Sequence, residues 1–234
     1  MTAGTPGPGS FSASLGGEKL FSAESAQDLD TQAPSWGLDP LALVEAAGRL
    51  CARLIIRDFP QLFSASPPKI VVAAGSGNNG ADALVMLRSL ILEGRASPAA
   101  SAVVINRLPG SGDHTPRSEA LRTLDKMGLP IYPWRDAVPQ SGFAGIDEAN
   151  IIIDGIAGTG LRGPLSGAAG EMAAWIGECK QRARAPGGTR GEPPPKPWIV
   201  SIDVPSGNFD GFEPSMPIIQ ADLTLAIEPK KACL

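Results

Sequence analysis

The feature that most constrains the fold is a series of short, uninterrupted apolar runs, most of them followed by a segment with helical periodicity. The runs are KIVVAA (69–74), SAVVIN (101–106), LPIYPW (129–134), NIIID (150–154), WIVSID (198–203) and ADLTLAI (221–227). Strands without apolar–polar alternation are buried on both faces, as in a parallel sheet covered by helices. The sequence therefore predicts an α/β fold, a Rossmann-like three-layer αβα sandwich with a mostly parallel central sheet.

The helices are expected between these strands and before the first one. Their predicted ranges are 21–30, 38–59, 81–93, 117–127 and 167–183. Asp39 can cap the second helix and Pro40 suits its first turn, whereas Gly94 and Gly128 can end the third and fourth. Residues 1–18 lack the basic start and apolar core of a secretory signal, so we expect a disordered tail before a domain over 19–234. Two inserts rich in glycine and proline, 107–117 and 185–197, are predicted as mobile loops.

Composition excludes several classes of partner. The chain has 234 residues, a net charge of −4 and 5% aromatic residues. It therefore lacks the basic face and the stacking platform of a nucleic-acid binder, and no apolar run reaches the roughly 18–20 residues of a membrane span. Cys51, Cys179 and Cys233 are far apart in the sequence. This spacing indicates reduced thiols in the cytoplasm and neither a disulfide framework nor a zinc site.

Three polar loops are expected at one edge of the sheet, because ligands bind beyond the carboxyl ends of parallel strands. The first loop, Gly75-Ser76-Gly77-Asn78-Asn79-Gly80, matches the pattern G-x-G-x-x-G, whose backbone amides suit a phosphate. The usual NAD signature also needs an acid after the next strand, where this chain has Asn106 and Arg107. An arginine there accepts a 2′-phosphate. A conventional NAD(P) oxidoreductase is nevertheless the weakest hypothesis, because Tyr132 has no lysine four residues on.

The polar residues of these loops carry hard oxygen atoms. Asn78 and Asn79 join Asp154, Asp203 and Ser206, which follow two other strands. Such a set suits an alkali or alkaline-earth cation or a polyhydroxylated ligand, and not zinc or iron. A structural interpretation stays open, in which the amides satisfy the turn and the two aspartates cap helices or pin loops.

Several motifs together resemble one known family. GSGNNGADALV resembles the G-x-G-N-N-G-G-D-G-L-V loop of the YjeF N-terminal family, the NAD(P)H-hydrate epimerases. IIIDGIAGTGLRGPLSG, VSIDVPSG and ADLTLAIEPKK are similar to three further motifs of that family, and LFSAESAQDLD and LVEAAG to its opening. The resemblance runs in order from about Leu20 to Lys231.

The resemblance implies epimerisation of the R and S forms of hydrated NADH and NADPH (NADHX and NADPHX), with a bound potassium ion. It implies Asn79, Asp154 and Ser206 as ligands of that ion. It further implies the substrate-binding residues Asn78, Asn79, Gly80, Ala81, Asp82, Gly158, Thr159, Gly160, Leu161, Arg162, Gly163, Pro164 and Asp203. It implies a homodimer and a partner NAD(P)HX dehydratase, separate or fused in a longer chain from which this one is cut. A non-catalytic binding or interaction module of the same family is the alternative.

Asp154 is the predicted general acid and base, since a carboxylate at a strand end can take the proton of the C6 hydroxyl and return it. Some positions differ from the family pattern: Ala81 and Ala83 replace glycines, and Ala46 replaces an asparagine. Lys230 and Lys231 are interpreted as a solvated chain end. His114, the single histidine, is expected to be exposed in its loop.

Overall fold

The computed structural model describes residues 13–15, 18–63, 67–134, 149–183, 197–227, 229 and 231. Most of the 185–197 insert, and residues 1–12 and 16–17 of the predicted tail, lie outside this description. The strands are β1 (Ala13–Leu15), β2 (Glu18–Leu20), β3 (Ile70–Ala74), β4 (Ser101–Ile105), β5 (Ile131–Pro133), β6 (Ile151–Gly155), β7 (Trp198–Ile202) and β8 (Leu223–Leu225). The helices are α1 (Ala23–Gln32), α2 (Pro40–Asp58), α3 (Asn78–Leu92), α4 (Pro116–Lys126) and α6 (Gly167–Ala183), with 3-10 turns η1 (Ala33–Trp36), η2 (Pro60–Phe63) and η3 (Pro98–Ala100).

Six strands form one sheet in the order β5-β4-β3-β6-β7-β8. Every neighbouring pair in it is parallel. The chain moves from β3 outward through β4 to β5, and then from β6 outward in the other direction to β8. Connections therefore leave β3 and β6 in opposite directions, which makes their carboxyl ends the topological switch point where ligands bind in such sheets.

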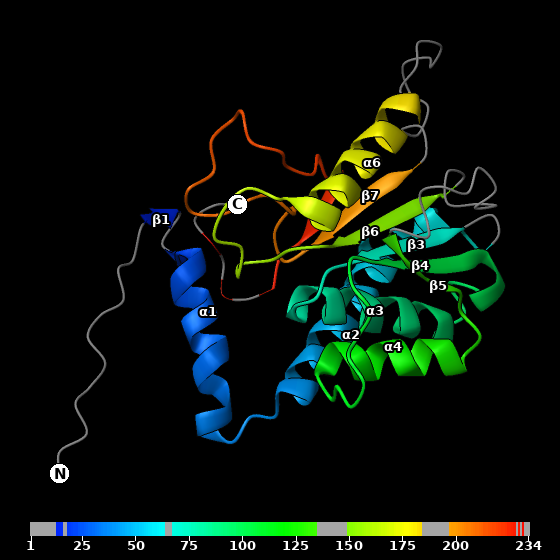
Figure 1. Cartoon of the computed structure of the whole chain (residues 1–234), viewed down its shortest axis with the longest axis horizontal. Helices are drawn as coiled ribbons and strands as arrows, with labels where there is room; N and C mark the ends of the chain where they lie inside the picture. The colour runs from blue at the N-terminus through cyan, green and yellow to red at the C-terminus, as the bar shows by residue number, and fades with distance from the viewer. Residues whose placement is uncertain are drawn as a thin grey trace.

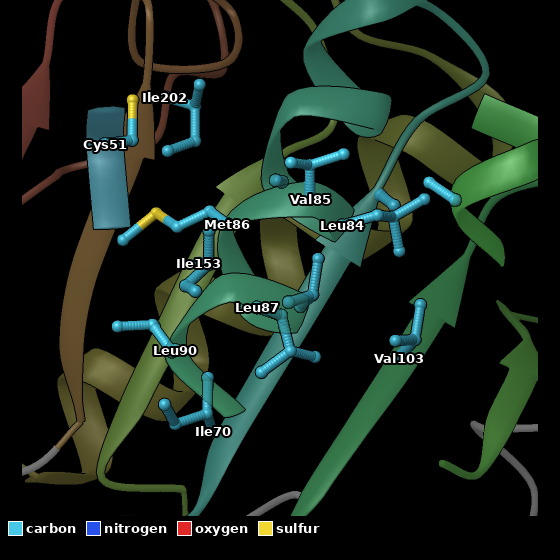
Figure 2. Close-up of a cluster of buried hydrophobic side chains, with 14 of the residues drawn as sticks. Cys51, Ile70, Leu84, Val85, Met86, Leu87, Leu90, Val103, Ile153 and Ile202 are labelled. Carbon is cyan, nitrogen blue, oxygen red and sulfur yellow. The ribbon is translucent and has the colours of Figure 1, made fainter. Parts of the chain in front are cut away.

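Helices cover both faces of this sheet, as predicted: α2, α3 and α4 lie on one side and α6 on the other (Figure 1). Alternate residues of β3 enter the two layers. Ile70 and Val72 join the core beneath α3, whereas Val71 and Ala73 join the core beneath α6. Figure 2 shows the first core, in which side chains of α3 lie against the sheet. The three-layer αβα prediction is confirmed.

The helix boundaries follow local capping. Asp39 accepts a hydrogen bond from the amide of Leu41 and precedes Pro40 in the first turn of α2, as the sequence predicts. Gly94 and Gly128 follow α3 and α4 with positive φ angles, which glycine adopts at little cost. The prediction for α3 was wrong at its start. The helix begins at Asn78 and not at Ala81, so the asparagines belong to its first turn.

Two short strands precede α1. β1 pairs with β2 in an antiparallel hairpin, so one segment of the predicted disordered tail has regular structure. No helix in the described part of the chain is long and apolar enough to cross a membrane.

Candidate active site

A cleft of about 560 Å³ opens beside the carboxyl ends of β3, β6 and β7. Its walls include Gly77 from the loop after β3, Gly158 from the loop after β6, and Asp203 from the loop after β7. Residues of α1 and of the segment after β8 complete it. The three loops predicted to meet at one edge of the sheet therefore do so.

Glycines hold the first two loops together. A Cβ on Gly75 would lie 1.8 Å from the carbonyl oxygen of Ile156, and one on Gly80 would lie 2.4 Å from that of Gly75. A Cβ on Gly77, in contrast, would meet no atom within 4 Å. Gly77 is the N-cap of α3 and lines the cleft. Since the first amides of a helix have no partner within it, the N-terminus of α3 offers the cleft an anion-binding site.

The alanines that replace family glycines are compatible with this arrangement. Ala81 and Ala83 lie within α3 and are fully buried in the core beneath it. Their backbone is helical, so a methyl group brings no conformational strain.

Asn79 stands out among the cleft residues because its amide has no partner. Its Oδ1 and Nδ2 atoms are buried, and neither makes a hydrogen bond within the described residues. The side chain packs against the loop after β6, since a Cβ on Gly158 would lie 3.1 Å from the Asn79 Cγ. A buried amide without partners is costly, so this position suits a ligand, an ion or an ordered water that would hydrogen-bond the amide.

Asp154 lies at the end of β6, fully buried, and binds the loop after β7. Its Oδ2 accepts hydrogen bonds from Ser201 Oγ (2.7 Å) and the Ser206 amide (3.0 Å). Its Oδ1 accepts from Ser206 Oγ (2.5 Å) and from the Ile156 amide (3.2 Å). Burial raises the pKa of Asp154, and the hydrogen bonds, those of Ser206 first, oppose that rise. The carboxyl group thus connects two of the three loops.

Asp203 forms a buried ion pair that the sequence did not reveal. Its Oδ1 accepts a hydrogen bond from Lys231 Nζ at 2.5 Å, and both residues line the cleft. Lys231 also donates to the carbonyl oxygen of Ile227 and is only 4% exposed. Its interpretation as a solvated residue was therefore wrong, while Lys230 lies outside the described residues. Among the described residues other than glycine, only Asp203 has a positive φ (64°).

Two further carboxyl groups line the same cleft. Burial, followed by the charges of Asp203 and Asp30, raises the pKa of Asp82 to about 8, against the opposing charge of Lys231. Its Oδ1 is buried without a hydrogen-bond partner. Burial also raises the pKa of Asp30, on α1. Asp82 is therefore more readily protonated than an ordinary carboxyl group, while Asp203 is paired with a cation.

The structure separates the predicted substrate-binding residues into two groups. The cleft is lined by Asn78, Asn79, Asp82, Gly158, Thr159, Gly160, Leu161 and Asp203. The predicted residues that do not line it are Gly80, Ala81, Arg162, Gly163 and Pro164. Of these, Arg162 donates a hydrogen bond to Gln27 of α1.

Sequence reasoning missed the contribution of α1, which supplies Ala26, Gln27, Asp30 and Thr31 to the cleft. His114 is exposed, as expected, and its Nδ1 lies 3.2 Å from Glu119. In the part of the chain that the structure describes, no three His, Cys, Asp or Glu residues form a group that could hold a metal ion.

The fold and the cleft together define a class: an α/β protein whose parallel sheet presents a helix N-terminus, an unpartnered amide and a buried carboxylate at its switch point. Comparison with known families agrees with that class. The family model described as YjeF-related protein N-terminus matches residues 40–233. The chain belongs to this family, as the motifs had indicated.

Similar proteins carry two kinds of name. The chain is 29% identical to the "Bifunctional NAD(P)H-hydrate repair enzyme Nnr" of Methanopyrus kandleri, over 83% of this chain and 34% of that protein. It is also 29% identical to the "NAD(P)H-hydrate epimerase" of Limosilactobacillus fermentum, over 85% of this chain and 79% of that protein. The chain thus spans about a third of the length of the bifunctional relative.

A solved structure supports the architecture alone. The crystal structure of yeast ynu0, YNL200c, matches with a TM-score of 0.69 and 24% identity, over 92% of this chain and 82% of that one.

Proposed function

We propose that this chain interconverts the R and S forms of NADHX and NADPHX. The observation that carries the proposal is the buried amide of Asn79, which has no hydrogen-bond partner among the described residues. It lies at the N-terminus of α3, in a cleft that also holds the Asp203–Lys231 ion pair. Relatives named NAD(P)H-hydrate epimerase support it, including one that this chain covers over 79% of its length. Incubation with either separated epimer tests it.

The N-terminus of α3 is the proposed seat of the dinucleotide diphosphate. Gly77 leaves space in front of the first helical amides, and no side chain caps them. The diphosphate carries the negative charge that this helix end favours. The hydrated nicotinamide then lies toward Asn79 and Asp203, and the Gly158–Leu161 loop covers it from the side of β6.

We propose that a potassium ion binds beside Asn79. Two contacts of the segment after β6 support this: Gly158 packs on the Asn79 side chain, and the Ala157 amide donates to Ser206 Oγ at 2.9 Å. Ser206 also contacts Asp154 directly. The donor set is amide, hydroxyl and carboxylate oxygen, which suits a hard cation. The ion supplies positive charge near the reacting oxygen when it is bound.

The potassium proposal has a direct structural test. A crystal structure grown in potassium is expected to show the ion on Asn79, Asp154 and Ser206. Side-chain oxygen atoms of these residues more than about 6 Å apart would contradict it, because hard-cation ligands lie within roughly 2.3–3 Å of one ion.

Asp154 is the proposed acid and base. Inversion at C6 is balanced if Asp154 takes the hydroxyl proton while the C6–N1 bond breaks and its electron pair moves to the ring nitrogen, which leaves an aldehyde at C6. The nitrogen then attacks the other face of the aldehyde, and Asp154 returns the proton to the C6 oxygen. Asp154 is fully buried and already accepts four hydrogen bonds, so the proposed role requires Ser206 or the loop after β6 to move when substrate binds. Asp203 already lines the cleft and is the next candidate.

We also propose that the chain forms a homodimer in the cytoplasm. Four of the six exposed large hydrophobic side chains in the described residues lie close together in the sequence: Trp36, Leu38, Leu41 and Leu50. Leu41 and Leu50 also line one shallow groove on α2, and exposed apolar side chains that lie together can mark an association surface. A Leu50→Glu variant is expected to shift the sedimentation coefficient to that of a monomer. A parent chain that is already monomeric at tens of micromolar would contradict the proposal.

The proposed metabolic partner is an NAD(P)HX dehydratase, fused or separate, that consumes one epimer. Relatives named as bifunctional repair enzymes support the fused form. The second candidate function, a non-catalytic binding module, predicts that the chain binds the hydrated dinucleotides without interconverting them.

A further inference from the structure

A second feature of the switch point lies on the β4 side of the cleft. Ile105 pairs with Ala74 in the sheet, and the Asn106 amide donates to the carbonyl oxygen of Ala74 at 3.3 Å. Neighbouring strands lie about 4.8 Å apart, so Arg107 leaves the sheet one strand spacing from the loop that carries Ser76. Ser76 lines the cleft.

Arg117 contacts the backbone of Arg107 at this point, and neither arginine makes an ion pair with an acidic residue of the described part of the chain. Arg117, in the first turn of α4, is 4% exposed and donates from Nη2 to the carbonyl oxygen of Arg107 at 2.6 Å. Its Nε is buried without a hydrogen-bond partner. The exposed Arg107 side chain makes no ion pair within the described residues. Burial and the charge of Arg107 lower the pKa of Arg117, and only Asp113 opposes this.

The other charged groups of this loop are already engaged. Arg122 pairs with Glu119 at 3.0 Å, and His114 lies 3.2 Å from the same carboxylate. The Asp113 carboxylate accepts the amide of Thr115 at 2.9 Å. Among the described residues, Asp113 is thus the acidic group whose charge acts on Arg117, and the Arg107 side chain makes no ion pair.

We propose that Arg107, whose backbone carbonyl oxygen accepts a hydrogen bond from Arg117, binds a phosphate monoester on the adenosine ribose of the substrate. The inference rests on the proposed function. With the diphosphate at α3 and the hydrated ring toward Asp203, the adenosine half extends to the β4 side of the switch point. A 2′-phosphate there meets an arginine in place of the acid that would hold a free 2′-hydroxyl. The site thus selects NADPHX over NADHX.

The test compares epimerisation of the two substrates. In Arg107→Ala, the ratio of kcat/KM for NADPHX to that for NADHX should fall about 10–100-fold, as expected for the loss of a charge-assisted hydrogen bond. Arg95→Ala is the matched control: Arg95 is also exposed but follows α3, before the start of β4. Its ratio should equal that of the parent. A ratio in Arg107→Ala within twofold of the parent would overturn the proposal.

A binding measurement separates this inference from the activity. By calorimetry, the parent should bind adenosine 2′,5′-bisphosphate about 10–100-fold more tightly than 5′-AMP, and Arg107→Ala should lose that difference. If the chain epimerises neither substrate but shows this pattern, the phosphate site stands and the proposed activity is wrong. If epimerisation is observed and the parent binds both nucleotides equally, the activity stands and the phosphate site is wrong.

Discussion

Replacement of Asp154 by asparagine should weaken the fold as well as the activity. Each carboxylate oxygen accepts one backbone amide, from Ser206 at Oδ2 and from Ile156 at Oδ1. An asparagine must place its NH2 group at one of these two positions. Whichever way the amide is turned, one buried backbone N–H then faces a donor. Serine hydroxyls can rotate to accept, but backbone amides cannot.

The expected loss follows from that arrangement. A buried donor left without an acceptor costs about 1–3 kcal/mol, and the remaining hydrogen bonds lose the strength that an ionised acceptor gives them. Asp154→Asn should therefore lower the free energy of unfolding by roughly 2–4 kcal/mol. The proposed acid–base role adds a loss of about 10²–10⁴-fold in the epimerisation rate of the folded variant.

Urea unfolding followed by circular dichroism measures the first effect, and epimerisation measured where both proteins are folded gives the second. Ser201→Ala is the control, since it removes one hydroxyl donor and should cost only about 1 kcal/mol. A variant within about 0.5 kcal/mol of the parent would refute the hydrogen-bond argument. A variant that epimerises at nearly the parent rate would refute the catalytic role and leave Asp203 as the candidate.

Three further predictions concern the cleft. Folding raises the pKa of Asp82 from 3.8 to about 8, so this residue stabilises the fold fully below pH 3.8 and loses that contribution as the pH rises to about 8. The free energy of unfolding in urea should therefore fall over this pH range in the parent, and the fall should be smaller in Asp82→Asn. Gly80→Ala should lower the free energy of unfolding by about 1–3 kcal/mol, because its Cβ would lie 2.4 Å from a backbone oxygen. The control Gly77→Ala should have a urea midpoint close to that of the parent, because its Cβ would meet no atom within 4 Å. Lys231→Met should lower the free energy of unfolding by about 3–5 kcal/mol. The added change Asp203→Asn should restore part of that loss, because it removes the unpaired charge and asparagine tolerates the left-handed backbone at this position; a double variant less stable than the single one argues against the buried pair.

Much of the fold was predictable because its signals are local. Uninterrupted apolar runs such as Ile70–Ala74 are buried on both faces, and a parallel sheet must bring the ends of such strands together. That topology alone predicts that Asp154 and Asp203 lie at the same edge of the sheet as Asn78 and Asn79, which follow β3. The start of α3 was missed because asparagine and glycine are poor helix formers, although they suit a first turn that opens on a ligand site.

Lys231 and α1 could not be placed from sequence for a different reason. The polar face of an amphipathic helix has the same pattern whether it meets water or a cleft, so Gln27 carried no signal of its role. Lysine near a chain end is usually solvated. Lys231 is instead buried in an ion pair with Asp203, a tertiary contact that no spacing in the sequence records.

The central claim is that this cleft interconverts two epimers, and one measurement tests it directly. The purified chain is incubated in potassium with R-NADHX alone and, separately, with S-NADHX, and both epimers are resolved by chromatography over time. The account predicts that the two incubations converge on the same epimer ratio, much faster than without protein. Interconversion no faster than in the protein-free control, from either epimer, would contradict the account and leave a binding module.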